Sequence, residues 1–174
     1  MGHQADDHPF WCFSLRRYAR QGVAPLCLAV QDETGADVNL LLFGMWIGSE
    51  GDAVHDDGAQ RAAEVVADWH EKVVRPLRGV RRWLKGNVTV PAEARDRLRE
   101  AVQAWEIESE RLEQDMLFGL HSRAPAALIH SPTPAPAPQD RAQIMTDNAA
   151  LLILAQTRRH PDRAALAELA RLCL

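Results

Sequence analysis

The sequence predicts an all-α protein: a compact helical bundle of about five helices, followed by a Pro-rich linker and a C-terminal helical pair. Ala, Leu, Arg and Glu dominate its 174 residues, and these residue types favour helix over strand. Apolar residues recur at helical spacing along much of the chain. The five Trp, four Phe and one Tyr all lie between Phe10 and Phe118. This asymmetry places the body of the protein before the last third of the chain.

Two short helices are expected first. One covers about residues 9–21, because Pro9 suits the first turn of a helix and Gly22 suits the position after its end. Pro25 can open the next helix, which covers about residues 25–32.

The third helix, about residues 38–48, is expected to be the buried centre of the fold. Asp37 can cap its N-terminus. Apolar side chains occupy nearly every side of this helix, so it has no face for water. The alternative is a β-hairpin of residues 26–31 and 38–43, but nothing else in the chain could complete a sheet.

Two longer helices follow a polar loop at residues 49–57. The first is expected over about residues 58–85, with a kink or break at Pro76 and Gly79. The second covers about residues 91–121 and carries an apolar stripe among charges of mixed sign. The tryptophans are expected on the inward faces of the helices: Trp11, Trp46, Trp69, Trp83 and Trp105.

The chain is expected to divide into four segments. These are a flexible N-terminus at residues 1–9, a helical core domain at 10–121, a Pro-rich linker at 122–139 and a C-terminal helical segment at 140–174. The linker contains the run PTPAPAP, which is typical of an extended, semi-rigid spacer.

Charge and cysteine content argue against several function classes. The net charge of −4 argues against nucleic-acid binding, and the longest apolar run is too short to span a membrane. The three cysteines show no C-x-x-C spacing, so they are expected to be small core residues in a reducing compartment. The N-terminal residues contain no secretory signal, and the protein is therefore expected in the cytoplasm.

The first candidate site is a polar cluster between two apolar segments: Gln31, Asp32, Asp37 and Asn39. Burying polar groups costs free energy unless they form hydrogen bonds, so this cluster could line a pocket or hold a cation. The structural alternative is that Asp37 caps a helix and Asn39 is a satisfied buried amide.

The second candidate site is a cationic stripe of five residues, with no acid, in a segment of 11: Arg75, Arg78, Arg81, Arg82 and Lys85. Arg75, Arg78, Arg82 and Lys85 share one helical face and are the predicted binding residues, because guanidinium groups fit phosphates and carboxylates. The alternative is a solvated face, or pairing with the acids of the next long helix. Those acids are Glu106, Glu108, Glu110, Glu113 and Asp115.

Evidence for catalysis is weak. Glu106 and Glu110 could perform acid–base chemistry or bind a metal, but neither begins a Glu-x-x-His motif, so we expect a solvated or Arg-paired face. The histidines, His70 included, are expected at the surface or at element boundaries. The chain has no nucleophile elbow, P-loop or dinucleotide fingerprint. We therefore expect no catalytic residue, no metal site and no cofactor.

Several segments resemble a known family. In the first segment the matching residues are Phe10-Trp11, Ser14-Leu15, Tyr18, Gly22-Val23, Cys27-Leu28, Gln31-Asp32, Gly35 and Asp37 through Leu42. Further matching stretches are Trp69-His70, Val74 through Arg78, Arg81-Arg82 and Glu106 through Arg111. They resemble an uncharacterised family of short helical proteins of proteobacteria, a domain of unknown function, over roughly residues 10–121. The resemblance implies a compact bacterial domain and no established activity.

Three functional hypotheses follow. The preferred one is a non-enzymatic cytoplasmic protein that binds a protein partner or a small anionic ligand through residues 75–85. The alternative is a small-molecule-binding protein or enzyme with a pocket among the first three helices, lined by Gln31, Asp32 and Asn39. The third is a subunit that docks through its C-terminal helical pair, and the oligomeric state stays open.

Overall fold

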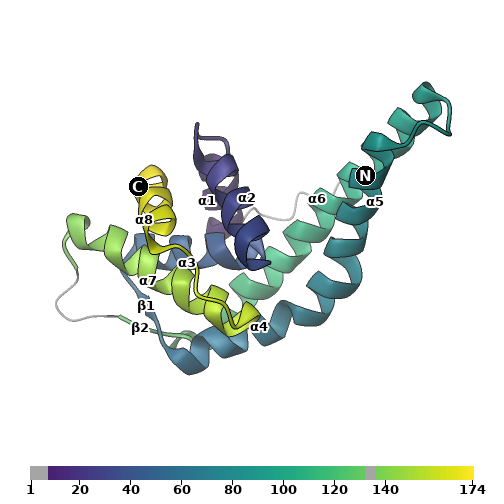
Figure 1. Cartoon of the computed structure of the whole chain (residues 1–174). Helices are drawn as coiled ribbons and strands as arrows, with labels where there is room; N and C mark the ends of the chain where they lie inside the picture. Colours follow the sequence, from purple (N-terminus) through teal and green to yellow (C-terminus); the bar gives the residue numbers. More distant parts are fainter. Residues whose placement is uncertain (1–7, 132–135) are drawn as a thin grey trace.

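The protein is built almost entirely from α-helices, which confirms the predicted fold class (Figure 1). The structure is a computed structural model that describes residues 8–131 and 136–174. The predicted flexible N-terminus therefore lies largely outside the described residues, as does the first part of the PTPAPAP run. In chain order the elements are α1 (Pro9–Tyr18), α2 (Val23–Thr34), α3 (Val38–Glu50), β1 (Ala53–Val54), α4 (Asp56–Trp69), the π-helical segment η1 (His70–Val74), α5 (Arg75–Gly86), α6 (Ala92–Arg123), the 3-10 turn η2 (Pro125–Ala127), β2 (Ile129–His130), α7 (Pro138–Thr157) and α8 (Arg163–Cys173).

Helix α3 lies at the centre of the hydrophobic core, as its sequence predicts. Its side chains Leu40, Phe43 and Ile47 are almost completely buried. Asp37 caps it, because its Oδ1 accepts a hydrogen bond of 2.9 Å from the backbone N–H of Asn39. Although α3 is apolar, neither it nor any other helix in the described part of the chain is long and apolar enough to cross a bilayer.

The alternative β-hairpin is wrong. Residues 26–31 lie within α2 and residues 38–43 lie within α3. Gly35 ends α2 in the left-handed region, with φ of +76°, and Asp37 then begins α3. A helix stop followed at once by a helix cap leaves no residues for a strand turn.

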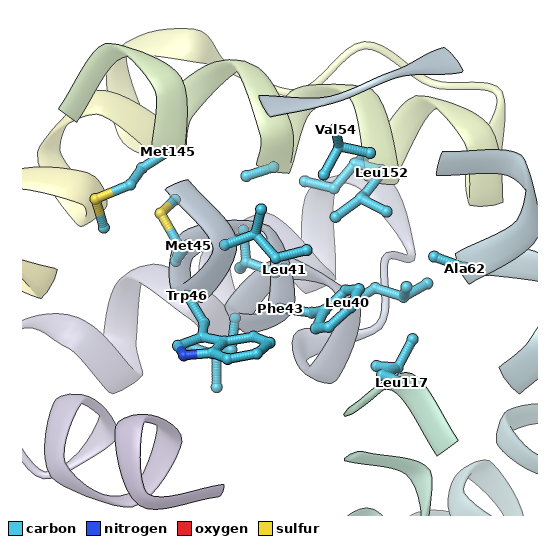
Figure 2. Packing of buried hydrophobic residues seen from close by; sticks show 14 of the residues in the cluster. Leu40, Leu41, Phe43, Met45, Trp46, Val54, Ala62, Leu117, Met145 and Leu152 are labelled. Carbon is cyan, nitrogen blue, oxygen red and sulfur yellow. The ribbon is translucent and has the colours of Figure 1, made fainter. Parts of the chain in front are cut away.

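The C-terminal helical pair packs against α3 and belongs to the same core. Leu152 and Ile153 of α7 and Leu166 of α8 are fully buried. Figure 2 shows Leu152 among the side chains of the core. The approach of α7 to α3 is close at Gly48, where an added Cβ would lie 2.6 Å from the backbone of Met145. The aromatic-free end of the chain therefore supplies part of the central core.

An antiparallel sheet of two strands, each two residues long, joins the predicted polar loop to the predicted linker. Ala53 pairs with His130, and Val54 pairs with Ile129. The side chain of Asn148 in α7 accepts a hydrogen bond of 2.9 Å from the backbone N–H of Val54. These contacts hold the segment after α3 and the segment after α6 beside α7.

The predicted long helix over residues 58–85 breaks before Pro76, and not at Gly79, which lies within α5. At the break the backbone N–H of Arg75 bonds to the carbonyl of His70, five residues earlier. Pro76 has no N–H, and its ring clashes with the carbonyl four residues before it in a regular α-helix. The wider π turn accommodates the proline and places His70 at the start of η1.

Helices α5 and α6 form a hairpin whose outer end extends away from the other helices (Figure 1). Among the described residues α5 packs mainly on α6 and η1. Trp83 and Trp105 are 63% and 67% exposed, so their predicted inward placement is wrong. The reason is geometric: their apolar faces lie where the hairpin has no third layer. Trp46, in the core, is nearly buried.

Candidate functional site

A cleft with a volume of about 530 Å³ opens between α1, α2, α3, α5 and α6. Its apolar residues are Trp11, Leu15, Tyr18, Ala19, Leu28, Val38, Leu42 and Ile107. Its polar and charged residues are Ser14, Gln31, Asn39, Arg78, Arg81, Arg82, Gln103, Glu106, Glu110 and Gln114. The cleft thus combines an apolar wall with hydrogen-bonding and charged groups, as small-molecule sites do.

Four of the seven predicted binding residues meet at this cleft. Gln31 and Asn39 come from the predicted polar cluster, and Arg78 and Arg82 come from the cationic stripe. The other three do not line it. Asp32 and Lys85 are exposed elsewhere, and Arg75 pairs at the surface with Glu71. In the sequence the polar cluster and the cationic stripe are two separate candidate sites. The fold brings Gln31 and Asn39 of the first together with Arg78 and Arg82 of the second.

Two arginines of the stripe are neutralised by glutamates of α6. Arg78 Nε lies 3.2 Å from Glu106 Oε1, and its Nη2 lies 2.6 Å from Glu110 Oε1. Arg81 also donates to Glu106. This confirms the predicted pairing between the stripe and the next helix for Arg78 and Arg81. It also confirms the expectation of an Arg-paired face for Glu106 and Glu110.

The pKa values of Glu106 and Glu110 shift in opposite directions, although both glutamates pair with Arg78. Burial raises the pKa of Glu106, but hydrogen bonds from Arg81 and Arg78 outweigh burial and bring this pKa below its usual value. Burial dominates at Glu110, and its pKa is raised despite Arg78. Glu106 is therefore the firmer anionic partner of the pair.

Arg82 supplies the surplus positive charge of the cleft. Three arginines and two glutamates line the cleft, which leaves a formal charge of +1. Because Arg78 and Arg81 bind the glutamates, the surplus belongs to Arg82, which is exposed and forms no ion pair within the described residues.

The floor of the cleft is a chain of buried amides. Gln114 Nε2 donates to Asn39 Oδ1 at 2.8 Å. Asn39 Nδ2 in turn donates to Glu113 Oε2 at 2.6 Å. Asn39 and Gln114 line the cleft, whereas Glu113 is fully buried beneath them. The amides therefore connect the cleft to a charged group inside the protein.

Behind this floor lies a buried cluster of Asp37, His70 and Glu113. His70 Nδ1 is 3.2 Å from Glu113 Oε1 and 3.4 Å from Asp37 Oδ2. Burial and the nearby charge of Glu113 raise the pKa of Asp37 to about 7. Burial lowers the pKa of His70, but the hydrogen bond with Glu113 and the charge of Asp37 outweigh burial and raise this pKa. The cluster can therefore hold a proton or a cation between its two carboxylates.

A comparison with models of known protein families found a match to the part of the chain that forms the cleft. A family model described as a protein of unknown function (DUF2390) matches residues 9–117, which is more than half of the chain. The chain belongs to this family. The expected resemblance to an uncharacterised family is confirmed. A search of curated proteins and a search of solved structures found no match.

The span matched by the DUF2390 family contains both the cleft and the buried cluster. Helices α7 and α8 lie beyond it. Nevertheless, the backbone N–H of Asp37 donates to Gln156 Oε1 of α7 at 2.8 Å. A helix outside the matched span thus helps to position one member of the cluster.

Two members of this cluster differ from what the sequence predicts. His70 lies at the boundary between α4 and η1, as one of the two expectations had it, but it is only 6% exposed, so the expectation of a surface position is wrong. Val66, His70 and Val74 are spaced four residues apart and are all buried, a pattern that could have placed His70 on the inner face. Glu113 is one of the acids expected to be available to the cationic stripe, but its observed partners are His70 and Asn39.

Proposed function

We propose that this chain is a cytoplasmic protein that binds a small molecule with an apolar body and an anionic group. The observation that carries the proposal is the cleft, which has apolar walls, a floor of amides and one arginine with unpaired charge. The proposal joins two predicted roles, because the anionic-ligand residue Arg82 and the pocket residues Gln31 and Asn39 line the same cleft.

The size and apolar lining of the cleft support a small-molecule ligand. Its volume of about 530 Å³ falls within the usual range of ligand sites, roughly 300–1,000 Å³. Leu15, Leu28 and Ile107 line it and are 51%, 42% and 49% exposed. Gathered apolar surface of this kind marks binding sites on soluble proteins. A ligand seated between these side chains would remove their apolar surface from water.

Arg82 supports an anionic group on the ligand. A guanidinium can bind a carboxylate or phosphate with two hydrogen bonds. Arg78 and Arg81 already bind Glu106 and Glu110, so a ligand would have to displace a carboxylate to reach them. Arg82 can bind the ligand without displacing a carboxylate. Of the residues in the cationic stripe, Arg82 is therefore the one proposed to bind the anionic group of the ligand.

The cysteines support the proposed compartment. Cys27 and Cys173 are fully buried, and neither they nor Cys12 form a disulfide. Burial raises the pKa of Cys27 to about 12, which keeps it as an unreactive thiol. Thiols of this kind are typical of proteins in a reducing compartment.

Two fluorescent probes with the same apolar body test the proposed ligand chemistry. 8-Anilinonaphthalene-1-sulfonate carries an anion, whereas N-phenyl-1-naphthylamine does not. Arg82→Gln should weaken binding of the sulfonate about five- to tenfold, since one charged hydrogen-bonding contact is lost, and should leave the neutral probe unchanged. Lys85→Gln is the matched control, because Lys85 is an exposed cation outside the cleft, and it should change neither affinity.

A second pair of variants locates the binding site. Leu28→Glu places a charge in the apolar wall and should abolish saturable binding of both probes. Leu98→Glu, at an exposed leucine of α6 outside the cleft, should leave both intact. The proposal fails if wild type binds neither probe saturably, or if Leu98→Glu and Leu28→Glu weaken binding equally.

A further inference from the structure

The buried cluster brings three potential metal-ligating atoms close together. One donor atom each from Asp37, His70 and Glu113 lie within 4.8 Å of one another. Bonds of about 2.0–2.2 Å from a metal to nitrogen and oxygen donors place neighbouring donors roughly 3–3.5 Å apart. The observed separations from His70 Nδ1 are 3.2 Å to Glu113 and 3.4 Å to Asp37. An ion could therefore take the place of the proton on His70 Nδ1 with little movement of these side chains.

Asn39 orients both carboxylates toward this point. Its backbone N–H holds Asp37 Oδ1 at 2.9 Å, and its side-chain amide holds Glu113 Oε2 at 2.6 Å. The remaining oxygen of each carboxylate faces His70 Nδ1. Hydrogen bonds that fix the outer oxygen of a carboxylate are the usual supports of a metal ligand.

The charges of the buried cluster are also incompletely balanced without an ion. Asp37 and Glu113 are both fully buried, and a buried carboxylate is costly unless it is paired and hydrogen-bonded. Asp37 Oδ2 has no hydrogen-bond partner within the described residues, although it points toward His70. A divalent cation would neutralise both carboxylates and would bind the unpartnered oxygen directly.

We propose that Asp37, His70 and Glu113 bind a divalent first-row transition metal ion behind the floor of the cleft. One imidazole nitrogen and two carboxylate oxygens form a mixed donor set that suits Mn²⁺, Fe²⁺, Co²⁺ or Zn²⁺. His70 binds as the neutral imidazole, so the ion displaces the proton that otherwise lies between His70 and the carboxylates. The site goes beyond the proposed function and does not depend on a ligand in the cleft.

The test uses the full-length protein, stripped with EDTA and incubated separately with Mn²⁺, Co²⁺ and Zn²⁺. We expect wild type to retain at least one of these ions at an equimolar ratio after gel filtration, as measured by elemental analysis. Bound Co²⁺ should give visible d–d bands, and the ion should raise the midpoint of thermal unfolding, because it binds the native state alone.

Conservative variants identify the ligands. Asp37→Asn and Glu113→Gln keep an oxygen that can accept from Asn39 but lose the charge, and each should weaken metal binding at least about 100-fold. Asp32→Asn and Glu108→Gln make the same changes at exposed acids and should leave the affinity unchanged.

Two results would overturn the proposal that Asp37, His70 and Glu113 bind a metal ion. One is wild type that retains none of the three ions, in which case a protonated His70 alone bridges the carboxylates. The other is retention that survives both Asp37→Asn and Glu113→Gln, which would place the ion elsewhere. The wild-type measurement requires no variant to fold, and probe binding in the cleft is measured separately, so failure of one proposal leaves the other intact.

Discussion

Asn39 connects the cleft to the buried cluster through three hydrogen bonds. It receives one from Gln114, and it donates to Glu113 and Asp37. A ligand that binds the side-chain amide of Asn39 from the cleft therefore competes with Gln114 or with Glu113. Contact of the proposed ligand with Asn39 would therefore couple binding in the cleft to the charge state of Asp37, His70 and Glu113.

Glu106 gives a prediction for the dependence of stability on pH. Its pKa is lower in the folded protein than the usual 4.5. A lowered pKa means that ionised Glu106 stabilises the folded chain above pH 4.5 and that this contribution disappears as the pH falls through the folded value. Glu106→Gln should therefore lower the free energy of unfolding by about 1–2 kcal/mol at neutral pH, a modest value because the ion pair borders an open cleft.

Urea denaturation of wild type and variant across the acidic range measures this effect. The difference between them should shrink below pH 4.5, where wild type also loses the charge. The raised pKa of Glu110 acts in the opposite direction, but it is present in both proteins and largely cancels. Glu108→Gln, on an exposed part of the same helix, should follow wild type. A difference that persists unchanged in acid would contradict the role assigned to the charge.

At the scale of elements, local signals in the sequence predict where helices begin and end. Asp37 caps α3, Gly35 ends α2, and an apolar helix occupies the centre. The expected end of the first helix at Gly22 is wrong, because α1 ends at Tyr18 and Gly22 instead precedes the first residue of α2. The break at η1 is less predictable, because Pro76 requires a disruption upstream without specifying the residue. Exposure of Trp83 depends on how far α5 extends past the other helices, and no local signal reports that distance.

Two glycines offer a matched prediction for helix packing. Gly79 lies in α5 with nothing within 4 Å of an added Cβ, so Gly79→Ala should raise the free energy of unfolding by about 0.5–1 kcal/mol through helix propensity. Gly48 lies in α3, where the same Cβ would lie 2.6 Å from the backbone of Met145. Gly48→Ala should lower the free energy of unfolding by about 1–3 kcal/mol, because α7 must move away.

Chemical denaturation of both variants checks the opposite signs. Because the substitution is the same in both helices, the comparison separates the effect of helix propensity on stability from the effect of the close approach between α3 and α7. If both variants were stabilised, the backbones of α3 and α7 would have to lie farther apart than the structure places them.

At the scale of the whole molecule, the candidate site shows what a single sequence can and cannot predict. Polar residues next to apolar segments identify Gln31 and Asn39, and charge density identifies Arg78 and Arg82. Their meeting at one cleft depends on the packing of five helices, which no local pattern specifies. The spacing of Val66, His70 and Val74 indicates an inner face for His70, but its contacts with Glu113 and Asp37 depend on the same packing. Sequence patterns therefore supply the components of a site, and tertiary structure decides which of them act together.

The C-terminal helices give the last prediction. A chain that ends after Ser131 lacks α7 and α8, including the fully buried Met145, Leu152, Ile153 and Leu166. Each such side chain contributes about 1.5–3 kcal/mol when buried, and the total stability of a domain is only about 5–15 kcal/mol. The truncated chain should therefore show no cooperative unfolding by urea, and light scattering should detect its association through the uncovered face of α3. Adding residues 136–174 as a separate peptide should restore the cooperative transition, because the missing surface then docks in trans. If the truncated chain instead unfolds cooperatively at the urea midpoint of the full chain, residues 10–121 fold on their own and the C-terminal helices are accessory.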